Sequence, residues 1–309
     1  MSEDANATLL PKPTMKTLTT RIAALLLALA LLGLNGALLA QNHYPAGVEG
    51  IKGASLPPPG FYLRDYNLFY FAGQVNDADG DELPPDFDLM AYAQAIRPIW
   101  ITKWKVLGAN YGMDVLVPFI YTDLEVNGAS DSSFNLGDIF VEPATLSWHT
   151  KRLDVGVGYG FWAPSGDYDA NDMTNPGKGF WSHMLTAGAT VFFDQEKTWA
   201  LSGLGRYEIH TENDDTGVTP GQTFTLEWGV SKTLAKTWDV GLVGYYRQQT
   251  TEDDGGPSED LDSVASVGPE VNVFCPKLKL FTSLRYLYEF TASDQPQGHT
   301  VTLTLTKIF

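Results

Sequence analysis

The feature that most constrains this chain is a strict alternation of apolar and polar residues, which recurs in stretches of about a dozen residues between residues 61 and 309. In residues 153–161, for example, leucine, valine, tyrosine and phenylalanine occupy the odd positions, while Asp154 and three glycines occupy the even ones. Because successive side chains of a β-strand point to opposite faces, this pattern predicts strands with one apolar and one polar face. We therefore expect an all-β fold.

The alternation predicts twelve strands, separated in turn by short connections and by longer acidic, glycine-rich loops. The strands are expected at residues 61–76, 87–101, 109–126, 134–149, 153–164, 181–194, 199–212, 222–233, 238–250, 262–275, 278–290 and 298–309. The long loops are expected at residues 77–86, 165–180, 213–221 and 251–261. An even number of such strands is typical of a transmembrane antiparallel up-and-down β-barrel, with both ends of the barrel region in the periplasm.

Composition excludes several other classes of protein. A formal net charge of −17 and a sequence pI near 4.5 argue against nucleic-acid partners. The single cysteine, Cys275, excludes an intramolecular disulfide framework and a cysteine-rich zinc site. A mean hydropathy of −0.12 does not argue against a membrane protein, because a barrel hides its lipid-facing residues in the alternation.

The N-terminal region predicts export. An apolar run from Ile22 to about Ala40 follows the basic residues Lys16 and Arg21, which is the layout of a cleavable signal peptide. We interpret residues 15–40 as that peptide and residues 1–14 as a start-site artefact before Met15. Cleavage after Ala37 and retention of the run as a membrane anchor are the alternatives.

The next stretch, residues 41–60, contains several glycines and the run Pro57–Pro59, which neither a helix nor a sheet ladder accepts. We interpret it as an irregular periplasmic lead-in to a barrel formed by residues 61–309. The polar face of the strand at 153–164 carries glycines, which favour open space inside the barrel. The same glycines could instead accommodate the three prolines folded inward as a plug.

The end of the chain resembles the terminal strand that the outer-membrane barrel assembly machinery recognises. Residues 301–309 alternate strictly and stop on Phe309, which we interpret as an assembly signal, although Lys307 stands where an apolar residue is usual. Tryptophans lie beside the short turns, as an interfacial girdle requires: Trp104, Trp148, Trp199 and Trp238. We therefore expect the outer membrane of a Gram-negative bacterium, with its lipids and lipopolysaccharide as surroundings.

Several short motifs spread over most of residues 60–309 carry a resemblance to a known family. They are LGANYG at 107–112 with Val117-Pro118, LGDIFVEP at 136–143, APSGDY at 163–168, GVTPG at 217–221, GLVGYYRQQ at 241–249 and GPEV at 268–271. Together they resemble the outer-membrane family named for the meta-pathway of phenol degradation. The resemblance implies a transporter-like barrel for hydrophobic or aromatic compounds, and it supplies no catalytic residues.

Ionisable residues on the non-lipid face are the candidate functional residues. They are Arg206, Glu208, His210, Glu227, Arg247, Arg285 and Glu289, with Glu142 and Glu270 as further candidates. Inside a barrel these groups must pair with one another or meet water. We expect the three arginines to pair with Glu208, Glu227 and Glu289, either around a narrow lumen or as a closed hydrogen-bonded filling.

The sequence contains no recognisable catalytic or metal-binding motif. Ser182 and His183 are adjacent, so a strand would point them to opposite faces. The acidic run 77–82 lacks the glycine that a calcium loop needs at its sixth position, where Glu82 stands. We expect no enzyme activity, cofactor or metal, and we interpret the chain as a passive channel for a small-molecule solute. A closed structural or surface-binding barrel and a lipid-modifying hydrolase are the alternatives.

Overall fold

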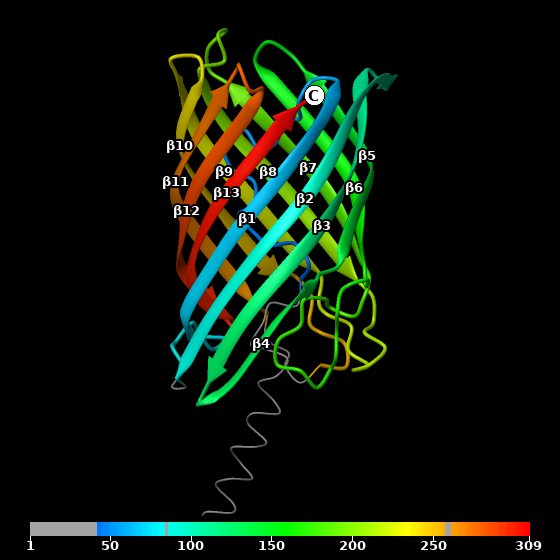
Figure 1. The fold of residues 1–309 in the computed structure, drawn as a ribbon, viewed down its shortest axis with the longest axis vertical. Coiled ribbons are helices and arrows are strands. Elements are labelled where there is room, and N and C mark those ends of the chain that lie inside the picture. Colours follow the sequence, from blue (N-terminus) through cyan, green and yellow to red (C-terminus); the bar gives the residue numbers. More distant parts are fainter. Residues whose placement is uncertain (1–41, 84–85, 257–260) are drawn as a thin grey trace, which may run out of the picture.

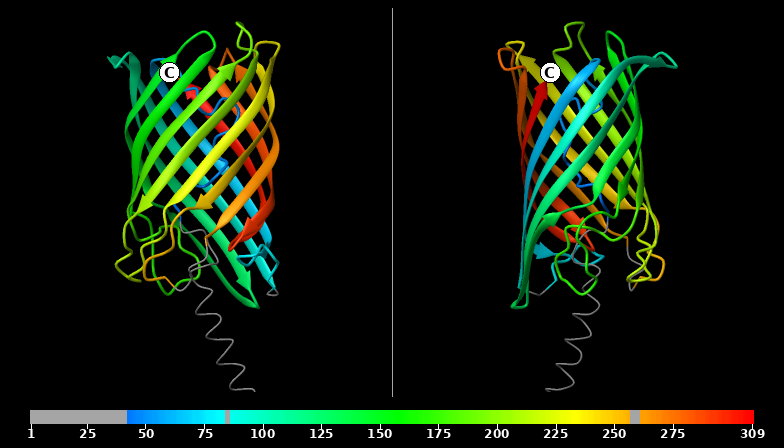
Figure 2. Two further views of the ribbon diagram at one scale, coloured as in Figure 1. Left: turned by 180° about the vertical axis from the view of Figure 1, so that it is seen from behind. Right: turned by 45° about the vertical axis from the view of Figure 1, so that its right-hand side comes forward.

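The computed structural model describes residues 42–83, 86–256 and 261–309, whose strands close into one antiparallel barrel (Figures 1 and 2). The strands are β1 Gly60–Val75, β2 Phe87–Val106, β3 Ala109–Val126, β4 Ala129–Leu136, β5 Ile139–His149, β6 Leu153–Ala163, β7 Ser182–Phe192, β8 Trp199–His210, β9 Thr223–Leu234, β10 Trp238–Gln249, β11 Ser263–Cys275, β12 Leu280–Ser293 and β13 Pro296–Ile308. Apart from β4 and β5, each strand pairs with its neighbours in sequence, and β1 pairs with β13 to close the sheet. Within the described residues, no helix is long and apolar enough to cross a membrane.

The barrel has twelve positions, because β4 and β5 share one of them. β3 pairs with β5 over residues 110–116 and with β4 over residues 119–126. The prediction of a twelve-stranded barrel is thus confirmed, but the single strand expected at 134–149 is wrong. The chain leaves the ladder at Asp138, because this carboxylate accepts hydrogen bonds from the backbone N–H groups of Gly166 and Lys178, at 2.8 and 2.7 Å.

The two ends of the barrel differ in their connections. At the end that we call the turn end, β1 begins, the C-terminus lies beside it, and the connections are short, such as residues 107–108 and 235–237 (Figure 1). At the opposite end, the loop end, long connections such as residues 164–181 and 211–222 extend beyond the strands. This arrangement follows from an even number of antiparallel positions.

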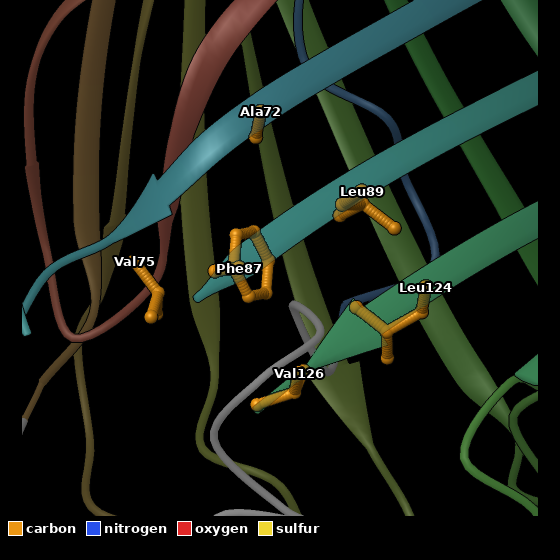
Figure 3. Packing of buried hydrophobic residues seen from close by; sticks show 6 residues of the cluster. All are labelled: Ala72, Val75, Phe87, Leu89, Leu124 and Val126. Carbon is orange, nitrogen blue, oxygen red and sulfur yellow. The ribbon is translucent and has the colours of Figure 1, made fainter. Parts of the chain in front are cut away.

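Three adjacent strands carry an apolar inner face near the loop end. Six buried side chains from β1, β2 and β3 form one cluster there, shown in Figure 3: Ala72, Val75, Phe87, Leu89, Leu124 and Val126. These residues alternate with outward ones along their strands, so they point into the barrel and not into lipid. Near the loop end, the inner wall formed by β1–β3 is therefore apolar.

Candidate functional site

Residues 42–59, which we call the lumenal segment, run through the inside of the barrel from the loop end to the turn end (Figures 1 and 2). Inward-facing glycines make room for the segment, since a Cβ on Gly156 would lie 2.7 Å from the Leu56 side chain and one on Gly188 would lie 2.9 Å from Ala54. The interpretation of this stretch as a lead-in outside the barrel is therefore corrected. Residues 42–56, and not chiefly the three prolines, occupy the lumen.

At the loop end, His43 anchors the segment. Its Nε2 lies 2.8 Å from an Asp138 carboxylate oxygen, and its Nδ1 lies 2.6 Å from Ser182 Oγ, which in turn lies 2.6 Å from His210 Nδ1. The His43 ring also stacks on Trp162. Burial lowers the pKa of His43 against the opposing effect of Asp138, so the ring is neutral at pH 7. A neutral ring that donates to Asp138 accepts the Ser182 proton at its other nitrogen.

In the middle of the barrel, Glu227 of β9 holds the segment. Its carboxylate accepts hydrogen bonds from the N–H groups of Gly47 and Glu49, at 3.0 and 2.9 Å, and from the Tyr44 hydroxyl at 2.8 Å. It also forms an ion pair with Arg206, whose guanidinium lies 4.1 Å from the centre of the Tyr44 ring. Glu227 is only 2% exposed, so these partners satisfy a charge that water does not reach.

Toward the turn end, Glu270 of β11 also binds the lumenal segment. It accepts hydrogen bonds from the Ile51 N–H at 2.9 Å and from Arg285 Nε at 3.0 Å. The fit is close, because a Cβ on Gly50 would lie only 1.9 Å from a Glu270 oxygen. Lys52 adds an ion pair with Asp239 at 3.0 Å. The lumenal segment is thus fixed mainly by its backbone N–H groups, which donate hydrogen bonds to carboxylates of the barrel wall. These bonds do not require the segment to form a strand.

All seven predicted lumenal residues are buried on the inner face of the barrel: Arg206, Glu208, His210, Glu227, Arg247, Arg285 and Glu289. Their pairing differs in part from expectation. Arg206 pairs with Glu227, but Arg285 pairs with Glu270, its neighbour across the β11–β12 ladder. The remaining members have other partners: Arg247 contacts Gln295 and lies 3.9 Å from Asp262, Glu208 accepts the Tyr44 N–H, and Glu289 accepts from Tyr70 and the Gly298 N–H.

A second charged cluster, centred on Arg97 of β2, was not among the predicted sites. Arg97 lies 2.7 Å from Asp114 and 2.8 Å from Glu142, while Arg64 of β1 binds Glu49 at 2.8 Å. The alternation in β1 and β2 already places both arginines on the inner face, so this signal could have identified them.

A cavity of about 400 Å³ remains between the lumenal segment and the inner wall formed by β1–β3. Its wall is mainly apolar and includes Leu68, Ala91, Ala93, Leu116 and Ile120. Charged groups also line parts of it, among them Arg97, Glu142, Arg206 and Arg247. A cavity of this size, with a mainly apolar wall and a smaller polar part, suits a small, largely apolar molecule.

The arrangement of Ser182, His43 and Asp138 contains the residue types of a nucleophilic triad, yet its geometry does not support catalysis. Ser182 is 0% exposed, and the lumenal segment that supplies His43 also covers the serine. A substrate therefore has no path to its hydroxyl group. His183, the adjacent residue, is exposed on the opposite face, as the alternation predicts.

The fold and the segment inside it define a class of protein, the twelve-stranded outer-membrane β-barrels. Residues 72–305 match the family described as "Putative MetA-pathway of phenol degradation", and the chain belongs to that family. The resemblance noted from the sequence motifs is thereby confirmed. A search of curated proteins gave no match.

Among solved structures, the chain is similar to the COG4313 outer membrane channel from Pseudomonas putida F1, with 15% identity and a TM-score of 0.76 over 86% of this chain and 100% of that one. It is also similar to the β-domain of the Bordetella autotransporter BrkA, with 13% identity and a TM-score of 0.49 over 82% of this chain and 100% of that one. Only the first likeness is close enough to establish a shared fold.

Proposed function

We propose that the protein is a passive outer-membrane channel for small, largely apolar solutes, aromatic ones included, which occupy the cavity beside β1–β3. The observation that carries the proposal is the mainly apolar wall of that cavity beside β1–β3, formed by residues such as Leu68, Ala93 and Leu116. A hydrophilic solute would exchange water for this apolar wall at a cost, whereas a benzene-sized solute gains from burial. Membership of a family named for phenol degradation supports the same class of solute.

Filling the cavity should therefore block transport. In the variant Ala93→Trp, the indole would occupy the space beside Leu116 and Ile120, and uptake of a labelled phenol-class solute by intact cells should fall to the level of cells without the protein. Intact cells are needed because the lipopolysaccharide leaflet slows passage of apolar solutes outside the barrel.

The matched control is Ala187→Trp, which makes the same change on the outward face of β7, where the alanine is exposed. This variant should fold and transport as the unchanged protein does. If Ala93→Trp takes up the solute as well as Ala187→Trp does, the cavity is not the solute path. Uptake by the unchanged protein no greater than that of cells without it would instead favour a closed structural barrel, the function that the filled lumen supports second best.

We also propose the features of export and assembly that the sequence predicts. The signal peptide at 15–40 and the prefix at 1–14 lie outside the described residues, while Phe309 is exposed at the turn end and contacts Phe61 through its ring. At this exposed position, Phe309 is accessible to the barrel assembly machinery. We expect lipopolysaccharide to surround the folded barrel.

Deleting Phe309 should accordingly lower the amount of folded barrel in cells several-fold. The readout is the band that migrates faster when the sample is not boiled, because a closed barrel resists detergent. The substitution Phe61→Leu removes the ring contact but leaves the chain end, so it should leave assembly unchanged. An unaltered yield after the deletion would show that other residues carry the signal.

A further inference from the structure

The outer wall of the barrel carries a polar patch at mid-strand on β1 and β2. Its members are Asp65 and Asn67 of β1 and Tyr92 and Gln94 of β2. Their neighbours Arg64, Tyr66, Ala93 and Ala95 line the lumen, so the alternation points all four members outward. Each member is partly exposed.

The depth of the patch makes it unusual. Asp65 and Asn67 lie on β1 between Phe61, which contacts the C-terminal Phe309 at the turn end, and Phe71, which stacks on His299 toward the loop end. Aromatic side chains of this kind mark the two margins of the lipid-facing band, so Asp65 and Asn67 lie near the middle of the hydrocarbon. Other strands carry apolar residues at mid-strand on this face, such as Val157, Leu226 and Leu242.

The hydrogen bonds within the patch leave some of its donor and acceptor groups without a partner. The Tyr92 hydroxyl donates to the Asn67 side-chain oxygen at 2.9 Å, and the Gln94 amide donates to Asp65 at 3.4 Å. In the part of the chain that the structure describes, the Asn67 amide N–H groups and the Gln94 carbonyl oxygen take part in no further hydrogen bond. Lipid tails offer these groups neither donors nor acceptors, which makes the exposed patch costly.

We propose that this patch, Asp65, Asn67, Tyr92 and Gln94, is an in-membrane interface between two copies of the chain. The free groups are self-complementary, because the Asn67 amide can donate to the partner's Asp65 or to the partner's Gln94 while the same bonds form in the opposite direction. A twofold interface requires this kind of self-complementarity. The surrounding outward residues, Phe69, Ile96 and Leu303, supply an apolar rim.

Disulfide formation tests the interface directly. With Cys275→Ser as background, oxidation of isolated outer membranes should link Asn67→Cys into a covalent dimer roughly fivefold or more above Ala187→Cys, because a twofold axis brings the two copies of position 67 together. Ala187 is the matched control, since it also faces lipid at mid-strand, on β7 across the barrel.

A second variant separates the interface from folding. Asn67→Leu with Gln94→Leu should give a barrel that still shows the unboiled gel shift but migrates as a monomer in mild detergent, where the unchanged protein migrates as a dimer. Equal crosslinking at positions 67 and 187, a crosslinked product of any mass other than two chains, or a dimer that survives the double substitution would overturn the proposal.

Discussion

Deleting residues 42–56 is expected to convert the lumen into an open, water-filled pore. The barrel itself is closed by ladder hydrogen bonds between strands, and none of these involves the lumenal segment. Barrels of eight strands fill with side chains and those of sixteen leave an aqueous channel, so twelve positions without the segment leave room for water. Conductance in planar bilayers should rise roughly fivefold or more, in proportion to the freed cross-section.

The charges that hold the segment tolerate its loss, because water that enters the lumen solvates Glu227, Glu270 and Asp239. The deletion variant should therefore still show the unboiled gel shift. A suitable control is Lys52→Ala, which removes one anchor but keeps the segment, and it should leave conductance near that of the unchanged protein. If the deletion variant conducts no better than the full chain, the segment is not what narrows the lumen.

The variant Glu227→Gln is expected to give the largest loss of stability from a single change. The amide has nearly the shape of the carboxylate, but it leaves the buried Arg206 charge uncompensated and weakens the three hydrogen bonds from the segment. Removing one member of a buried ion pair typically costs ~3–5 kcal/mol in the free energy of unfolding. Urea-dependent unfolding in lipid vesicles measures this difference.

The control is Glu125→Gln, a carboxylate exposed at the loop end of β3, for which a change within about 0.5 kcal/mol is expected. Combining Glu227→Gln with Arg206→Gln should recover part of the loss, because the second substitution removes the uncompensated charge. A Glu227→Gln barrel as stable as the control would mean that water already solvates Arg206.

Alternation was enough to predict the barrel, because every residue of a strand in a bilayer faces either lipid or lumen. It located the seven inward ionisable residues, yet it misassigned Arg285, whose partner Glu270 depends on the register between β11 and β12. The alternation of apolar and polar residues alone carries no information about that register. It also missed the break at Asp138, which is set by hydrogen bonds from residues about 30 and 40 positions away.

The lumenal segment lay beyond prediction for a different reason. Its apolar and polar residues do not repeat at a strand or helix period. Its path follows from contacts with side chains far along the chain, such as Gly47 with Glu227 and Ile51 with Glu270. The clue in the sequence was the run of inward glycines on β6. Of these, Gly156 does face Leu56 of the segment, whereas Gly158 faces Glu142 and Gly160 faces the Phe140 ring.

The most direct test of the account is methyl NMR of the barrel labelled at its alanines, titrated with phenol. Ala93 of β2 faces the cavity and Ala187 of β7 faces lipid, so the two methyl groups report on the inside and the outside of the barrel. If phenol binds in the cavity, the Ala93 methyl resonance should shift saturably, as should those of the neighbouring Ala91 and Ala95, while Ala187 shows only a small linear change. In Ala93→Trp, the shifts at Ala91 and Ala95 should be lost. Equal, unsaturable changes at both positions would show that phenol merely partitions into the surrounding lipid or detergent and would contradict a solute site in the cavity.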